Sequence, residues 1–321
     1  MEFLGHTISG ALALAPMAGV TDYAFRTVCA QTGAAITVTE MVSSRALVYQ
    51  DKKSRALLRK NEGSLCGAQI FGNDPQIMAQ AAVLAIEHSG CDFLDINMGC
   101  PMPKIANNGD GSALLKDIPL AGRIVRAVKD VVSVPVTVKL RLGWDKGSIN
   151  AVEMARALEA NGADALTVHG RTKTMLYSGR ADWDAIGAVV RAVSVPVIAN
   201  GDIFSAEDAL RCRAHSGASL FMLGRGTFGD PWLFSQVEAA LAGQSVPERP
   251  PLAERMELAL RQFSLAAEDK GEHIACLEAR KHLAWYLRGV PHSGFYKEQI
   301  SHLSTADEVQ AVVKAIRRDL R

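Results

Sequence analysis

Hydrophobic, β-branched segments alternate with stretches of helical spacing through the first 226 residues of the chain. The segments expected to form strands are residues 12–15, 36–42, 66–71, 93–97, 136–142, 165–169, 195–199 and 219–223. The stretches between them, such as 75–88 and 151–161, are expected to form helices, and several end at a glycine that suits the left-handed turn after a helix. Continuously apolar strands that alternate with helices pair in parallel with both faces covered. Eight such units predict an α/β fold, a closed (β/α)8 TIM barrel.

The pattern changes after Gly226. Pro247, Pro250 and Pro251 mark a linker, and no good strand follows. Residues 252–268, 274–287 and 306–320 instead have the spacing of amphipathic helices. We therefore expect a barrel domain over 1–245 and a C-terminal all-helical domain over 246–321.

The overall charge is nearly balanced. The chain has 35 Lys and Arg against 34 Asp and Glu, and its 48% hydrophobic content is that of an ordinary globular protein. With a net charge of +1, binding to a polyanion needs a local basic patch. Arg280, Lys281, Arg288 and the segment 314–321 supply basic clusters in the helical part, which fit a solvated helix face equally well.

Other signals narrow the class of protein. No apolar segment approaches the roughly 20 residues of a membrane span, and no basic leader precedes the first strand. Six cysteines without a CxxC pair indicate free thiols, and no Cys/His cluster has metal-ligand spacing. No GxGxxG follows the first strand, which disfavours a Rossmann fold. We expect a cytoplasmic, metal-free monomer.

Polar residues gather where the expected strands end, which is where barrels of this class hold their active sites. These residues are Glu40, Gln69, Asn97, Lys139, Arg141, His169, Asn200 and Arg225. Polar groups in apolar strands are costly to bury unless they are paired or used, so this coincidence favours a site.

Two glycine-rich turns, Asn200-Gly201-Asp202 and Gly224-Arg225-Gly226, follow the last two strands. Their bare backbone N–H groups suit a phosphate, the usual ligand at this place in a TIM barrel. Either turn alone is explained as well by the end of a strand. Together, on neighbouring strands, they favour a phosphate site.

Alternation along the fifth strand turns Lys139 and Arg141 toward the barrel interior. Lys139 would either stabilise the negative charge of a reduced flavin or pair with Glu40 or Asp95. His169 fits a hydrogen-bonded core histidine as well as a site residue.

Cys100 stands in a loop directly after the fourth strand, between Gly99 and Pro101. A lone cysteine is usually a small buried hydrophobe, but this one lies at the end of the barrel where the site is expected. With a normal pKa of about 8.5, its thiol is mostly protonated near neutral pH and can donate a proton.

Six ordered motifs resemble those of the bacterial tRNA-dihydrouridine synthases. They read APMAGVTD at 15–22, DINMGCP at 95–101, VKLRLGW at 138–144, VHGRT at 168–172, IANGDI at 198–203 and MLGRG at 222–226. The segment RKH at 280–282 is also similar, and TEMVSS at 39–44 and INM at 96–98 most resemble the B branch.

The resemblance implies an enzyme that uses FMN and NADPH to reduce a D-loop uridine of tRNA, U17 by its branch, to 5,6-dihydrouridine. It implies hydride transfer from flavin N5 to C6 of a flipped-out base and a proton from Cys100 to C5. The implied cofactor-binding residues are Pro16, Met17, Ala18, Gln69, Lys139, His169, Asn200, Gly201, Asp202, Gly224 and Arg225. The implied substrate-binding residues are Asn97, Arg141, Arg171, Lys173, Arg280 and Lys281.

The loop NNGDG at 107–111 departs from the family pattern, which has a small apolar residue near Asp110. Two other functions stay open. One is an FMN barrel reductase of a free small molecule, similar to the dihydroorotate dehydrogenases, which the basic helical domain disfavours. The other is a tRNA-binding protein without redox activity, which Lys139, Cys100 and the phosphate turns disfavour.

Overall fold

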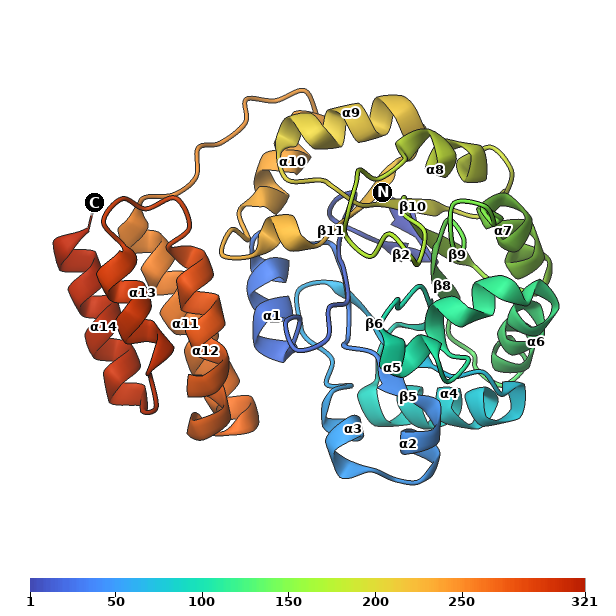
Figure 1. Ribbon diagram of the computed structural model, residues 1–321, viewed down its shortest axis with the longest axis horizontal. Coiled ribbons are helices and arrows are strands. Elements are labelled where there is room, and N and C mark those ends of the chain that lie inside the picture. Colours follow the sequence, from blue (N-terminus) through green and yellow to red (C-terminus); the bar gives the residue numbers. More distant parts are fainter. Residues whose placement is uncertain (321) are drawn as a thin grey trace.

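The computed structural model describes residues 1–320, and its central feature is a closed barrel of parallel strands ringed by helices (Figure 1). The barrel strands are β3 (Leu12–Leu14), β4 (Ile36–Val38), β5 (Val42–Ser43), β6 (Leu65–Phe71), β7 (Phe93–Met98), β8 (Val136–Arg141), β9 (Ala165–His169), β10 (Val197–Asn200) and β11 (Leu220–Leu223). Each pairs in parallel with its neighbour, and the β11–β3 and β4–β6 pairings close the ring. The predicted (β/α)8 fold is confirmed.

The second strand differs from the prediction. The expected strand 36–42 is divided into β4 and β5, and both pair with β6. Between them the Thr39 hydroxyl accepts the Gln69 backbone N–H, and the Glu40 side chain accepts the Gly19 N–H instead of continuing the ladder. The seventh strand also begins later than predicted, at Val197, directly after a proline that has no N–H to donate.

The outer layer contains ten helices and two 3-10 segments among the described residues. They are α1 (Tyr23–Gln31), α2 (Ser44–Val48), α3 (Lys52–Ala56), α4 (Pro75–Ser89), α5 (Pro103–Ala106), η1 (Gly111–Lys116), α6 (Ile118–Lys129), α7 (Ala151–Ala160), α8 (Trp183–Val190), α9 (Ala206–Ser216), η2 (Arg225–Thr227) and α10 (Leu233–Leu241). Asp74 caps the N-terminus of α4, and Gly90 ends it with a left-handed φ of 61°.

Alternating side chains divide the barrel core into two layers. Val136, Val138 and Leu140 of β8 pack in the layer between the strands and the helices. The residues between them, among them Lys139 and Arg141, therefore face the interior as predicted. A short hairpin that the sequence pattern did not reveal, β1 (Glu2–Phe3) and β2 (His6–Thr7), packs Phe3 into the interior cluster at the strand starts.

A helical region follows the proline-rich linker and lies beside α1 (Figure 1). It comprises α11 (Leu252–Lys270), α12 (Glu272–Tyr286), α13 (Gly294–Ser301) and α14 (Ala306–Asp319). Residues such as Met256, Cys276 and Ile316 form a core separate from that of the barrel. Helix α13 was not predicted, because its eight residues are too few to establish a clear period.

Among residues 1–320, none of the helices combines the length and the apolar character of a membrane span. The same residues contain no group of three or more His, Cys, Asp or Glu side chains placed to hold a metal ion.

Candidate active site

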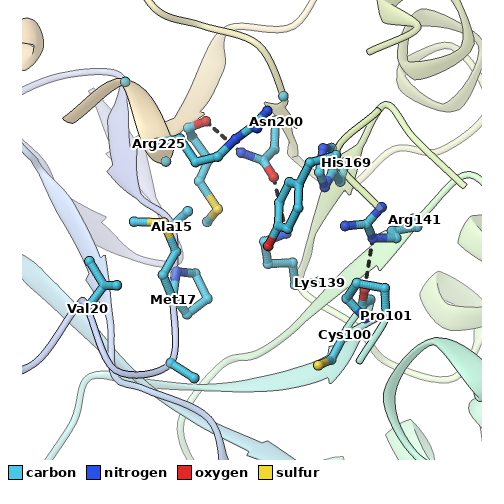
Figure 2. A pocket seen from close by; sticks show the side chains of 18 of the residues that line it. Ala15, Met17, Val20, Cys100, Pro101, Lys139, Arg141, His169, Asn200 and Arg225 are labelled. Atoms are coloured by element: carbon cyan, nitrogen blue, oxygen red, sulfur yellow. Dashed lines mark hydrogen bonds between the residues drawn. The ribbon is translucent and has the colours of Figure 1, made fainter. Parts of the chain in front are cut away.

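A cavity of about 490 Å³ opens at the C-terminal ends of the barrel strands. Figure 2 shows Cys100, Lys139 and Arg225 around it, contributed by three different strand ends. The predicted residues that line it are Pro16, Met17, Ala18, Asn97, Cys100, Lys139, Arg141, His169, Asn200, Gly201, Asp202, Gly224 and Arg225. The barrel therefore brings most of the sequence-predicted site together in one cavity.

Lys139 is held by an amide rather than by a carboxylate. Its Nζ donates to Asn200 Oδ1 at 3.1 Å, and Asn200 Nδ2 donates to the Met222 carbonyl at 2.8 Å. Neither Glu40 nor Asp95 forms a hydrogen bond with it among residues 1–320. Burial, and then the nearby Arg141, lower the pKa of Lys139 to about 8. Its ammonium is therefore a half-buried cation at the cavity wall, hydrogen-bonded to a neutral amide.

Behind the cavity, a chain of buried hydrogen bonds runs from Asp95 to the Cys100 loop. Asp95 accepts from Thr137 Oγ1 at 2.5 Å and from Gln69 Nε2 at 2.6 Å, and burial raises the pKa of Asp95 to about 6. Gln69 Oε1 accepts from Asn97 Nδ2 at 2.9 Å. Gln69 does not line the cavity, so its side-chain oxygen contacts Asn97 and does not face the cavity.

The Cys100 loop is positioned through its backbone. Asn97 Oδ1 accepts the Cys100 N–H at 2.8 Å, and Arg141 Nε donates to the Gly99 carbonyl at 3.0 Å. Burial raises the pKa of the Cys100 thiol above its usual value, so it stays protonated at neutral pH. A buried, protonated thiol at the wall of the cavity can act as a proton donor.

The divergent loop 107–111 packs against the cysteine. Gly111 has φ +58°, and a Cβ there would lie 3.1 Å from the Cys100 carbonyl and 3.2 Å from its Cβ. The Asn108 carbonyl accepts Asn73 Nδ2 at 2.8 Å. Burial raises the pKa of Asp110. Gly111 thus permits the loop to approach Cys100 closely.

Two buried arginines hold the next loop. Arg141 also donates to the carbonyls of Thr172 and Leu176, each at 2.9 Å. Arg171 donates to the Gly179 carbonyl at 2.7 Å and to Asp202 Oδ2 at 2.6 Å. Arg171 is 1% exposed and does not line the cavity, so its described contacts are structural rather than with a ligand.

The glycine turns fit a phosphate by their lack of side chains. A Cβ at Gly201 would lie 2.9 Å from the His169 ring, and one at Gly226 would lie 2.6 Å from the Ile203 carbonyl. Burial, followed by Lys139, lowers the pKa of His169 well below its ordinary value, so this ring is neutral at pH 7. Arg225, with 36% of its side chain exposed, supplies a cation beside these turns.

Besides Arg171, three more predicted substrate residues lie outside the cavity and have partners within the protein. Lys173 Nζ lies 4.2 Å from the centroid of the Trp144 ring. Arg280 Nε donates to the Leu303 carbonyl at 2.9 Å, and Lys281 Nζ donates to the Gly19 carbonyl.

Sequence reasoning missed the apolar and aromatic part of the lining. These residues are Met41, Met102, Tyr177, Phe204, Met222 and Phe228. Most stand in loops just beyond a predicted strand, and that position is the signal that could have found them. Tyr177 lies 4.7 Å from the Arg225 guanidinium, measured to the ring centroid, so aromatic and cationic groups meet at the rim.

The sequence model of the family described as dihydrouridine synthase (Dus) matches residues 13–320. The chain is 38% identical to tRNA-dihydrouridine synthase B of Pasteurella multocida, over 96% of this chain and 93% of that protein. It is 41% identical to tRNA-dihydrouridine synthase B of Pseudomonas putida, over 97% and 92%.

A solved structure is similar in fold alone. Histamine dehydrogenase from Rhizobium sp. 4-9 superposes with a TM-score of 0.59 at 16% identity, covering 83% of this chain and 50% of that one. The family match extends over nearly the whole chain, and the relatives named B share about two fifths of its residues. The chain therefore belongs to the dihydrouridine synthase family of oxidoreductases and is similar to its bacterial B members.

Proposed function

We propose that this protein binds FMN, takes electrons from NADPH and reduces one D-loop uridine of tRNA, U17, to 5,6-dihydrouridine. We further propose that it acts in the cytoplasm as a monomer. The observation that carries the proposal is the single cavity that Cys100 and Lys139 line together. A protonated thiol and a lysine ammonium at one strand-end cavity suit the addition of a hydride and a proton to a double bond.

The residues present fit FMN. Gly201, Gly224 and Arg225 would hold its phosphate, because the two turns have no room for a side chain at Gly201 or Gly226 and one cation lies beside them. Pro16, Met17 and Ala18 would lie along the ring, with Lys139 as its polar partner. Bound FMN supplies the hydride chemistry that side chains cannot.

The protein's own groups then do the remaining work. The Cys100 Sγ–H donates a proton to the base, and Asn97 and Arg141 hold the loop that carries it. His169 stays neutral and adds no competing charge.

We propose that residues 1–245 form the catalytic unit and residues 246–321 the tRNA-binding unit. The exposed basic residues of the helical region, such as Arg288 and Lys314, support this division. RNA of this kind is gripped through shape and phosphates, which basic helix surfaces can contact.

The test is a position-resolved map of dihydrouridine. Purified protein, FMN and NADPH are incubated with tRNA that lacks the modification, and a sample without NADPH is the control. We expect dihydrouridine at U17 alone. A yellow protein that oxidises NADPH and modifies no site would favour a small-molecule reductase, and a protein that takes up no flavin would favour a tRNA-binding role.

Replacement of Lys139 by methionine is expected to weaken FMN binding about 10- to 100-fold, the usual contribution of a hydrogen bond to a charged group. Lys139 loses its proton as the pH rises through about 8, so wild-type affinity is expected to fall between pH 7 and pH 9. The variant should show no such fall. Quenching of FMN fluorescence at both pH values measures this, and equal pH dependence in both proteins would remove Lys139 from the flavin site.

A further inference from the structure

The helical region contacts two of the loops that line the cavity. Lys281 of α12 donates to the carbonyl of Gly19, in the loop that follows β3. The Trp285 ring, one turn further along α12, stacks on Phe228 with centroids 4.2 Å apart and planes 12° apart. Phe228 itself lines the cavity. Helix α12 thus touches the walls of the active site from outside the barrel.

The loop at Gly19 is held from two sides. Its N–H donates to Glu40 of the barrel, and its carbonyl accepts from Lys281 of the helical region. Gly19 has φ +72°, and a Cβ there would meet nothing within 4 Å, so side-chain packing does not fix this point of the loop. The neighbouring residues Met17 and Val20 line the cavity. Met17 and Val20 also pack on the barrel core, and Thr21 hydrogen-bonds to Met17 within the loop, so at Gly19 contacts from the two domains add to this local structure.

A second lysine forms an ion pair with a residue at the end of the same loop. Lys270 of α11 pairs with Asp22 at 2.6 Å and with Glu278 at 2.7 Å. Asp22 caps α1 by accepting the Phe25 N–H at 2.8 Å. These ion pairs link α11 and α12 to the N-terminus of α1.

The face of α12 that meets the barrel has helical spacing. Glu278, Lys281, His282 and Trp285 lie at i, i+3, i+4 and i+7, which places them on one side of the helix. His282 packs on the Phe25 ring of α1 with centroids 5.4 Å apart. Lys281 is therefore on the barrel side of α12, although the family resemblance implied a contact with the substrate.

We propose that α12 is a structural part of the cofactor site and that Lys281 is a positioning residue, which holds residues 16–20 in the conformation that lines the cavity. This inference rests on the proposed function, because the ligand whose binding it affects is FMN. It assigns the helical region a role at the flavin in the absence of tRNA.

The test compares Lys281→Met with the full-length wild type. We expect FMN affinity without tRNA to fall roughly tenfold, the scale of one charge-assisted hydrogen bond, and the salt dependence of tRNA binding to stay unchanged. Lys281→Arg should restore most of the FMN affinity. Lys297→Met, which removes an exposed lysine of α13, is the matched control and should alter neither quantity.

Hydrogen exchange gives a second measurement that does not need FMN. The peptide covering 16–22 should exchange faster in Lys281→Met and not in Lys297→Met. Normal FMN affinity and exchange with a flatter salt dependence would make Lys281 a phosphate contact and overturn the inference. A wild-type protein that takes up no FMN would instead contradict the proposed function, and the inference with it.

Discussion

Replacing Cys100 with alanine is expected to lower the rate of dihydrouridine formation by about 10² to 10⁴, the usual contribution of a positioned general acid. FMN binding and NADPH oxidation should continue. The loop survives the change because Asn97 and Arg141 hold it by backbone atoms and not through the thiol. Single-turnover reduction of unmodified tRNA by the prereduced protein measures the step directly.

The pH dependence of turnover is a second test of the role of Cys100 as the proton donor. Burial raises the Cys100 pKa, and the protonated form is the active acid, so at saturating FMN wild-type turnover should fall only as the pH rises past the ordinary thiol value. Cys100→Ser should lack this fall. Cys212→Ala is the matched control, since this buried thiol lies on α9 and outside the cavity. Wild-type turnover in Cys100→Ala would remove the thiol from the mechanism.

The sequence predicted the barrel and the end at which its site lies, because both follow from periodicity. Strands of period two and helices of period 3.6 determine which residues face inward, and Lys139 and Asn200 meet as their strand ends suggested. The interruption of the second strand was missed. It depends on where the Thr39 and Glu40 side chains find partners, and the apolar pattern does not contain that information.

The hydrophobic periodicity of the sequence also cannot distinguish residues that line the cavity from residues in the layer behind them. Gln69 and Arg171 stand near strand ends, yet Gln69 contacts Asp95 and Asn97, and Arg171 holds loop carbonyls and Asp202. Their partners come from loops whose conformations have no repeat. The resemblance supplied roles for both residues, but only tertiary structure shows that other side chains or backbone groups already occupy their polar atoms.

Asp202 is another residue whose partners only the tertiary structure reveals, and its replacement is expected to have the second large effect, on the free energy of unfolding. The resemblance placed it among the residues that hold the flavin phosphate and ribityl chain, and a carboxylate repels a phosphate. In the structure its Oδ2 accepts from Arg171 at 2.6 Å and from the Ala181 N–H at 2.8 Å, and its Oδ1 accepts from Arg225 at 3.3 Å. Asp202 therefore lines the cavity as the counter-ion that holds two arginines.

Replacing Asp202 with asparagine is expected to lower the free energy of unfolding by about 3–5 kcal/mol, the usual cost of leaving a buried ion without its partner. The Arg171 side chain is 2% exposed and cannot turn to water, whereas the partly exposed Arg225 can. Asparagine suits the test because it tolerates the φ of +56° at this position, so the change removes charge without adding backbone strain. Denaturant unfolding of the FMN-free protein measures the loss.

Asp184→Asn is the control for this experiment, since Asp184 pairs with His215 on the surface and such exposed pairs contribute about 1 kcal/mol or less. Saturating FMN should return part of the stability lost in Asp202→Asn, because a bound phosphate brings negative charge back beside Arg225. A loss no larger than that of the control would mean that Arg171 does not depend on this carboxylate. In that case its carbonyl acceptors at 178 and 179 would suffice to hold the loop.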